Sequence, residues 1–414
     1  MRRRSACELG ALAALAPAAL QAAEPLQVLW MFSSGSQRTL WLRMTERYSA
    51  LRAGHAVQSR EMEQGAYKAE FEALLRREPA GGDVAFWFGG QRLQEFVAQG
   101  LIEPLDDLAR SERWEQQFLP AALDAVRVGG RLYGLPLTTY QWGFYYRRSL
   151  FGRLELQPPT SWDEWLTLNE RLRRAGIAPI TLGAKDGWPL GAWFDYFNLR
   201  LHGKTFHTEL LAGRASWLDP RVSEVLARWR TLLERADFLP GALERDWQQA
   251  LPYLTRELAG TVLMGNFVAL RFPATVREDL GFFPFPVLDP KVPAIEEAPL
   301  DVLLMPRRGR RKAEAREFLR FMARAEVQAE LNEAMGLIPP HRYAALGRDP
   351  LVQAGARLLA AAQGSTQYFD RDAPARFSGP ALALLQRFVQ APQESKAVQQ
   401  GLEALRRSVF GATP

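Results

Sequence analysis

Cysteine is almost absent from this sequence of 414 residues, because its single copy is Cys7 near the N-terminus. The rest of the chain can therefore form no disulfide, no thiolate metal site and no thiol nucleophile. Histidine is also scarce, and the closest pair, His202 and His207, has a spacing that does not place both rings on one helical face. We therefore expect no metal site.

Common catalytic motifs are missing as well. The sequence contains no GxxxxGK[ST], GxSxG or HExxH motif and no glycine-rich dinucleotide fingerprint. We expect no cofactor, and nothing in the sequence requires an enzyme. The net charge is +6, but basic and acidic residues are interleaved, as in RVSEVLARWRTLLER. This mixture favours a solvated surface, and we expect no nucleic-acid partner.

Residues 1–23 have the plan of a secretory signal peptide. Arg2, Arg3 and Arg4 precede the short apolar run LGALAALAPAAL, and two alanines follow before Glu24. The run is shorter than the roughly 20 apolar residues that span a membrane. An ordinary N-terminal helix is the alternative. Cys7 lies before the apolar run, whereas a lipid-anchored cysteine would follow it. We therefore expect an exported, soluble, periplasmic protein without a lipid anchor.

The next part of the chain alternates strand and helix patterns. The segments LQVLWMF (26–32), AVQSREME (56–63) and GGDVAFWFGG (81–90) read as strands, and a helical pattern follows each. This alternation predicts an α/β fold with a parallel or mixed sheet. Ligands of such sheets lie beyond the carboxyl ends of the strands, so residues 33–36, 63–67 and 87–90 are candidate binding loops.

Helical signals dominate later in the chain. Ser161 and Glu164 have the spacing of a capping box, which predicts a helix over residues 162–175. Asp219 followed by Pro220 predicts the start of another helix. A proline-rich passage then breaks the helical periodicity, and helices resume at about Lys312.

Aromatic residues gather in a few places, most densely between Thr138 and Trp165. Some of these rings must be core. Tyr140 and Trp142, however, have Gln141 and two threonines beside them, and a flat ring among polar groups suits the apolar face and the hydroxyls of a sugar. Similar mixtures recur in AKDGWPLGAWFDYFN and MGNFVALRFP. A ligand site is therefore a serious alternative to a purely structural role.

Several motifs give the sequence a resemblance to a known family. They are GDVAFWFGG…EFVAQGLIEPLDDL, GGRLYGLPLTTYQWGFYYRRSLFGRLELQPPTSWDEW, GWPLGAWFDYFNLRLHG, DWQQALPYL, AGTVLMGNF, GFFPFP and AREFLRFMARAEVQAELNEAMGLIPP. Over nearly the whole chain after the leader, the sequence resembles the extracellular solute-binding proteins of carbohydrate ABC importers, the group related to maltose-binding protein. Two departures are Arg147–Arg148, where an asparagine–lysine pair is common, and Phe267, where many members have tryptophan.

The resemblance implies an α/β, two-lobed periplasmic-binding-protein fold with a cleft between the lobes and hinge crossings. Its N-lobe would comprise residues 26–135 plus 285–335, and its C-lobe residues 136–284 plus 336–414, with hinges near Leu135 and Val287. The protein would be a monomer that captures a mono- or oligosaccharide in the cleft and delivers it to the ABC permease subunits.

The candidate substrate-binding residues come from both lobes. Trp142 and Trp188 are expected to stack on a sugar, Asn266 and Asp301 to recognise hydroxyls, and Trp247 to belong either to the cleft or to the core. The full set is Ser34, Ser36, Gln64, Trp87, Gly89, Tyr140, Trp142, Trp188, Trp247, Asn266 and Asp301.

Two other functions stay open at this point. One is a secreted carbohydrate-active enzyme with an acid pair among its Asp and Glu residues. The other is a binder of an anionic sugar or phosphoester, for which Lys185 or Arg271 would have to reach the cleft. Asp301 and Asn266 favour a neutral sugar, because carboxylate and amide groups suit hydroxyls.

Overall fold

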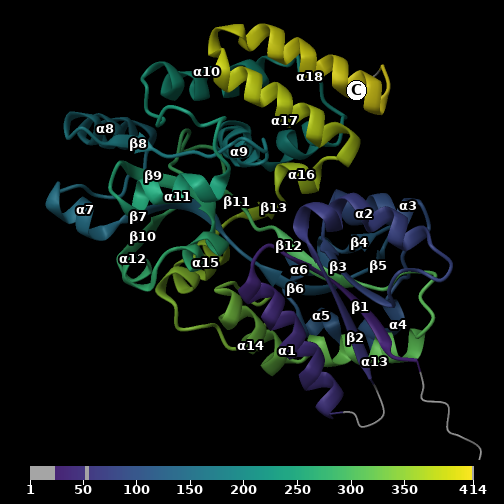
Figure 1. The fold of residues 1–414 in the computed structure, drawn as a ribbon. Helices are drawn as coiled ribbons and strands as arrows, with labels where there is room; N and C mark the ends of the chain where they lie inside the picture. The colour runs from purple at the N-terminus through teal and green to yellow at the C-terminus, as the bar shows by residue number, and fades with distance from the viewer. Residues whose placement is uncertain (1–23, 52–55, 413–414) are drawn as a thin grey trace, which may run out of the picture.

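The computed structural model describes residues 24–51 and 56–412, so the predicted signal peptide, residues 1–23, lies outside the described residues. The described chain has two hydrophobic cores, each built on its own β-sheet. Residues between 26 and 137 and between 300 and 331 form one core, and residues between 140 and 285 and between 337 and 402 form the other. Figure 1 shows the two resulting bodies, which we call the N-lobe and the C-lobe.

The N-lobe sheet has five strands in the order β2-β1-β3-β12-β6. Its strands are β1 (Leu26–Phe32), β2 (Val57–Glu63), β3 (Val84–Phe88), β6 (Leu135–Thr139) and β12 (Leu300–Leu304). β1 runs parallel to β2 and β3, whereas β12 is antiparallel to β3 and β6. The inner strand β3 is buried along its whole length, and the polar sequence of β2 suits its place at the edge.

Helices cover this sheet. They are α1 (Gly35–Leu51), α2 (Gln64–Arg76), α3 (Gln91–Ala98), α4 (Asp106–Ser111), α5 (Trp114–Gln117), α6 (Pro120–Asp124), α13 (Lys312–Ala323) and α14 (Ala325–Met335), and β4 (Arg127–Val128) forms a short hairpin with β5 (Arg131–Leu132). The rings of Trp30 and Trp41 stack with their centroids 4.4 Å apart and so attach α1 to β1. The carboxyl ends of β1 and β2 lead directly into α1 and α2.

The C-lobe sheet has the order β10-β7-β9-β8. Its strands are β7 (Trp142–Arg147), β8 (Ala178–Ile180), β9 (Ala259–Gly265) and β10 (Leu280–Phe283). Its helices are α7 (Arg148–Arg153), α8 (Trp162–Arg174), α9 (Pro189–Leu211), α10 (Pro220–Glu234), α11 (Trp247–Thr255), η1 (Asn266–Arg271), α12 (Ala274–Glu278), α15 (Pro350–Ala361), α16 (Phe369–Asp372), α17 (Ala375–Gln390), η2 (Pro392–Glu394) and α18 (Ser395–Phe410). The predicted capping box of α8 is confirmed, since Ser161 and Glu164 cap each other's backbone amides.

The lobes are joined where the chain crosses between them. The small parallel pair β11 (Ile295–Glu297) and β13 (Gly364–Thr366) lies between the lobes in Figure 1. The chain leaves the N-lobe sheet after Thr139, returns between Glu297 and Leu300, and leaves again near Met335, which packs against both cores.

These crossings correct the predicted boundaries near Leu135 and Val287. Residues 136–139 belong to the N-lobe sheet, because β6 pairs with β12 at its edge, where Pro136 needs no second hydrogen-bonded neighbour. Phe285 packs in the C-lobe core, and β11 pairs with a C-lobe segment. Residues 285–297 therefore belong to the C-lobe, whereas the sequence prediction assigned them to the N-lobe.

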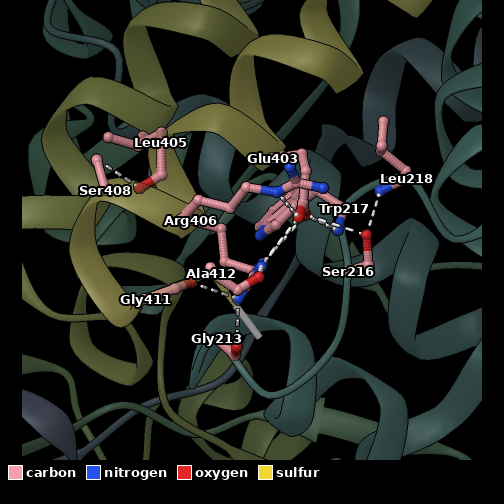
Figure 2. Close-up of polar contacts among 11 residues, drawn as sticks. Gly213, Ser216, Trp217, Leu218, Glu403, Leu405, Arg406, Ser408, Gly411 and Ala412 are labelled. Carbon is pink, nitrogen blue, oxygen red and sulfur yellow. Dashed lines mark hydrogen bonds and ion pairs between the residues drawn. The ribbon is translucent and has the colours of Figure 1, made fainter. Parts of the chain in front are cut away.

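A buried ion pair attaches the last helix to the C-lobe (Figure 2). Glu403 on α18 accepts hydrogen bonds from the Trp217 amide (2.9 Å) and the Ser216 hydroxyl (3.1 Å), and it pairs with the fully buried Arg406 (2.9 Å). Arg406 also donates to the Gly213 carbonyl. α18 is thereby attached to the turn that precedes α10. Within the described residues, no helix is both long and apolar enough to cross a membrane.

We predict that Glu403→Gln lowers the free energy of unfolding by about 3 kcal/mol, because it leaves the Arg406 charge buried without its partner. Burial alone would raise the pKa of Glu403, but hydrogen bonds from Arg406 and Arg407 outweigh it and lower the pKa to about 2. The stabilisation is therefore complete above the unfolded-state pKa and is lost as the pH falls toward 2.

Urea unfolding at neutral and acidic pH measures both effects. The control is Glu394→Gln, whose side chain is 43% exposed in its pair with Arg387, and its effect should stay below about 1 kcal/mol. Equal effects of the two substitutions would contradict the prediction.

Candidate functional site

A cleft lies between the two lobes, with about 820 Å³ of empty space that is partly open to solvent. Its N-lobe wall comes from β1, α1, α2, β3, β12 and the end of α14. Its C-lobe wall comes from β7, α11, η1 and α16 and from the residues just before β7, α9 and α16. The lining residues are Met31, Ser33, Gln37, Gln64, Lys68, Phe88, Tyr140, Trp142, Trp188, Trp247, Phe267, Asp301, Met335, Leu337, Tyr368, Asp370 and Arg371.

The structure brings six of the eleven predicted residues together in this cleft. They are Gln64, Tyr140, Trp142, Trp188, Trp247 and Asp301. Ser34 and Ser36 lie instead in a smaller adjoining cavity. Contact of any of these residues with a ligand stays a prediction.

Trp87 and Gly89 do not line the cleft. The ring of Trp87 stacks on Phe71 of α2 at 4.0 Å, inside the N-lobe core. Side chains alternate along a strand, so the next residue, Phe88, points into the cleft and shares a sheet face with its cross-strand partner Asp301. Gly89 donates its amide to the Leu300 carbonyl, and an added Cβ would meet the Ala125 carbonyl oxygen at 3.2 Å. The sequence prediction therefore chose the wrong face of β3, because it named Trp87 and Gly89 whereas Phe88 between them lines the cleft.

Asn266 is also absent from the cleft lining. Its side chain is 1% exposed, accepts a hydrogen bond from the Tyr145 hydroxyl and donates one to the Gly336 carbonyl. Both polar ends of the amide are therefore engaged within the protein. Its role here is to fix the end of β9 against the loop after α14.

The C-lobe wall of the cleft is aromatic. Trp142 is only 2% exposed, stacks on Tyr368 at 4.8 Å and meets Trp188 edge-on at 6.1 Å. Trp188, Trp247 and Phe267 are partly exposed and pack edge-to-face or tilted against one another. Trp142 therefore supports the wall from behind, and the three outer rings provide most of its accessible surface.

The opposite wall carries an ion pair between the lobes. Arg371 of α16 donates to Asp301 Oδ1 of β12 at 2.9 Å and to the Tyr140 hydroxyl at 2.9 Å, and its guanidinium lies 4.2 Å from the Phe88 ring centre. Burial raises the pKa of Asp301, and the charge of Arg371 opposes that effect. Asp301 Oδ1 is thus occupied, while the second carboxylate oxygen remains as an acceptor at the cleft.

Sequence reasoning missed Lys68, Tyr368, Asp370 and Arg371. Lys68 follows Gln64 by one helical turn on α2, a spacing that places both on one face and could have indicated it. Partial desolvation between the cleft walls lowers the pKa of Lys68, although its side chain keeps contact with water. No local pattern marks the other three, which follow β13 far along the chain.

Comparisons with known proteins agree with this geometry. The sequence model of the family described as "Bacterial extracellular solute-binding protein" matches residues 50–329. The chain belongs to this family. A solved structure of the bacterial solute receptor AcbH, described as having an exclusive preference for β-D-galactopyranose, has a TM-score of 0.87 and 26% identity, and the match covers 93% of this chain and 99% of that one.

Curated relatives match over shorter lengths. An ABC transporter extracellular-binding protein of Pyrococcus horikoshii is 31% identical over 244 residues, which are 58% of this chain and 55% of the relative. A second P. horikoshii protein of the same description is matched over 57% of its length. A Rhizobium meliloti protein named "Probable sugar-binding periplasmic protein" is 25% identical over 68% of this chain and 72% of its own length. The chain thus spans a little over half of the two P. horikoshii relatives.

Two further contacts join the lobes of this solute-binding protein around the cleft. Arg271 of η1 donates to the Ser33 carbonyl (3.3 Å) and hydroxyl (3.2 Å), and Arg92 of α3 donates to the Asp370 carbonyl (2.6 Å). Arg271, which the sequence offered as a partner for an anion, therefore reaches the cleft margin, whereas Lys185 does not line the cleft. In the described part of the chain, no group of three His, Cys, Asp or Glu residues could hold a metal ion.

A pair of buried carboxyl groups lies beneath the crossing strands. Asp195 of α9 and Glu297 at the end of β11 are neighbours, both are fully buried, and none of their carboxyl oxygens has a hydrogen-bond partner among the described residues. Burial raises the pKa of each well above its usual value, and for Glu297 the charge of Asp195 adds to the effect. His207 lies 3.8 Å from Asp195, but burial lowers its pKa to about 3, so it brings no charge at neutral pH.

The other ionisable groups around this pair do not neutralise it. Glu296 is paired with the buried Arg200, and burial raises the pKa of Asp372 to about 6, although Lys204 and Arg371 act in the opposite direction. At least one of Asp195 and Glu297 must therefore hold a proton for the pair to stay buried.

We predict that the pair makes the protein less stable as the pH rises. The pKa values of Asp195 and Glu297 in the folded protein lie above their unfolded-state values of about 4. Their contribution to stability is therefore complete below about pH 4 and declines as the pH rises toward the folded-state pKa values. Glu297→Gln should reduce the pH slope of the unfolding free energy by up to about 1.4 kcal/mol per pH unit. Urea unfolding at a series of pH values from acidic to neutral measures this slope. The exposed Glu278→Gln is the control, and an unchanged slope in Glu297→Gln would contradict the prediction.

Proposed function

We propose that this chain is the substrate-binding component of an ABC sugar importer. In this proposal the exported, periplasmic protein captures a mono- or oligosaccharide between its lobes and delivers it to the permease, acting as a monomer and without covalent chemistry. The observation that carries the proposal is a cleft in which the partly exposed rings of Trp188 and Trp247 face polar groups of the N-lobe. Family membership supports it.

The two walls suit the two kinds of surface on a sugar. A pyranose has apolar C–H faces, which pack on aromatic rings, and a rim of hydroxyls, which need donors and acceptors. Gln64 offers both a donor and an acceptor, Lys68 offers donors, and Asp301 offers an acceptor. Each wall alone binds one aspect of the ligand, so a sugar would bind best when both lobes enclose it.

This division favours a binding mechanism based on lobe closure. A ligand that contacts both walls binds the closed arrangement better than an open one, and it shifts the equilibrium by that difference in affinity. The permease would then recognise the closed form.

The rival functions are less well supported. The cleft carboxylates Asp301 and Asp370 are both paired, with Arg371 and Arg92 respectively, and an acid–base pair for glycoside hydrolysis would need at least one protonated carboxyl group. Among the residues that line the cleft, the cations Lys68 and Arg371 equal the acids Asp301 and Asp370 in number, which suits a neutral sugar; Arg92, which pairs with Asp370, does not line the cleft.

Calorimetry against a sugar panel, with product analysis of each mixture, tests the proposal. The panel begins with β-D-galactopyranose, because AcbH is described as preferring it, and adds maltose, raffinose, a uronate and a sugar phosphate. Binding without conversion supports capture, whereas turnover would refute it in favour of an enzyme.

We predict that Trp188→Ala weakens binding of the best sugar by about ten-fold or more, because an aromatic face contributes roughly 1 kcal/mol beyond the apolar area that it covers. Calorimetry gives the affinity, and the thermal midpoint shows whether the variant is folded. Tyr343→Ala, at a ring that is 71% exposed and outside the cleft, is the matched control. An unchanged affinity in folded Trp188→Ala would remove this ring from the site.

We also predict little effect of salt on the affinity. The affinity for a neutral ligand should differ by less than about two-fold between low and high ionic strength, because salt screens only interactions between charges. A steep loss with salt, together with tighter binding of the uronate or the sugar phosphate, would identify an anionic ligand and leave the importer proposal intact.

A further inference from the structure

A second cavity adjoins the cleft, with about 470 Å³ of empty space that is partly open to solvent. We call it the outer compartment and the cleft described above the inner compartment. Five residues line both, namely Ser33, Gln37, Phe267, Met335 and Leu337, so the two spaces share a wall. The outer compartment adds Ser34, Ser36, Leu40, Leu270, Arg271 and Ala334. Like the inner one, it is bounded by both lobes.

The N-lobe side of the outer compartment is polar. The Ser34 and Ser36 hydroxyls lie 3.1 Å apart at the start of α1. Gln37 is held in place because its Oε1 accepts from the Ser33 amide at 2.8 Å. Among the described residues nothing accepts from Gln37 Nε2, so these donors remain for another molecule.

The C-lobe side combines apolar surface with a cation. Leu270 is 39% exposed and Phe267 is partly exposed. Arg271 uses one terminal nitrogen for its contact with Ser33, and within residues 24–51 and 56–412 no carboxylate pairs with it. None of its other N–H groups donates a hydrogen bond within the described protein, and the guanidinium lies 5.7 Å from the centre of the Trp247 ring. The compartment has the same combination as the inner one, an apolar surface with hydrogen-bond donors around it.

We propose that the outer compartment is a second sugar subsite, so the ligand is a glycoside of at least two units. One ring lies in the inner compartment, and the next ring packs against Phe267 and Leu270. The hydroxyls of this second ring accept hydrogen bonds from Arg271 and Gln37. The inference rests on the proposed function, because it assigns a ligand length to the same site.

Matched sugar pairs test this subsite by calorimetry. The probes are galactose with lactose and melibiose, and glucose with maltose and cellobiose, so each monosaccharide is extended with different linkages. We expect at least one disaccharide to bind roughly ten-fold more tightly than its monosaccharide, as one or two added hydrogen bonds would produce. Arg271→Met should reduce this ratio about five-fold or more, because one such contact is lost. Arg256→Met, at an exposed arginine outside both compartments, should leave it unchanged.

A second variant fills the compartment instead of removing a donor. Ala334 lines only the outer compartment, so Ala334→Phe should exclude the second ring and lower the affinity for the disaccharide alone. Glu333→Phe, at the preceding exposed position of α14, is the control. It adds the same ring without lining the compartment.

The outcomes separate this inference from the proposed function. If monosaccharides bind and extension adds no affinity, or if Arg271→Met weakens both members of a pair equally, the second subsite is refuted and sugar capture stands. An equal loss would mean that Arg271 acts only through its contact with Ser33 between the lobes. If no sugar binds at all, both proposals fail.

Discussion

Burial of the Arg371 guanidinium between the lobes is the constraint on which the cleft depends. A guanidinium with 11% of its side chain exposed needs a partner, because the loss of water would otherwise outweigh its packing. Asp301 supplies that partner from the N-lobe, Tyr140 adds an acceptor, and the Phe88 ring lies against the charge. The short helix α16 is thereby attached to the N-lobe sheet.

The position of Asp301 makes this contact sensitive to the arrangement of the lobes. Asp301 lies at the start of β12, a few residues after β11 leaves the C-lobe, so it stands at a crossing. The buried pair Asp195–Glu297 lies at the other end of the same short connection. A relative rotation of the lobes would therefore act on both the ion pair of the cleft and the acids beneath it.

The crowded rings between Thr138 and Trp165 have several roles. Phe144, Tyr145 and Trp165 are fully buried in the C-lobe core, where Phe144 and Trp165 contact each other with centroids 5.0 Å apart. Tyr140 and Trp142 lie where this core meets the cleft. Trp142 is too buried to offer much surface, but it holds Trp188 and Tyr368 in place. One dense aromatic segment thus builds the core and supports the wall of the site.

The sequence determined what depends on local pattern. Alternating strands and helices gave the α/β class, and the capping residues gave the start of α8, because these signals act between neighbours in the chain. Gln64 could be placed at the cleft from the end of a readable strand and Trp188 from its aromatic and polar surroundings, and contact of either residue with a ligand stays a prediction. The face of β3 was not determined, since a slip of one residue exchanges Trp87 for Phe88.

Only the tertiary structure decided which distant residues complete the cleft. Arg371 and Tyr368 follow no motif, and they reach the cleft because β13 pairs with β11 and brings α16 back to the crossing. Asn266 has a side chain suited to a sugar, yet the packing of Tyr145 and Gly336 around it engages both of its polar ends. Whether a polar group is available to a ligand depends on its neighbours in space, which local sequence does not specify.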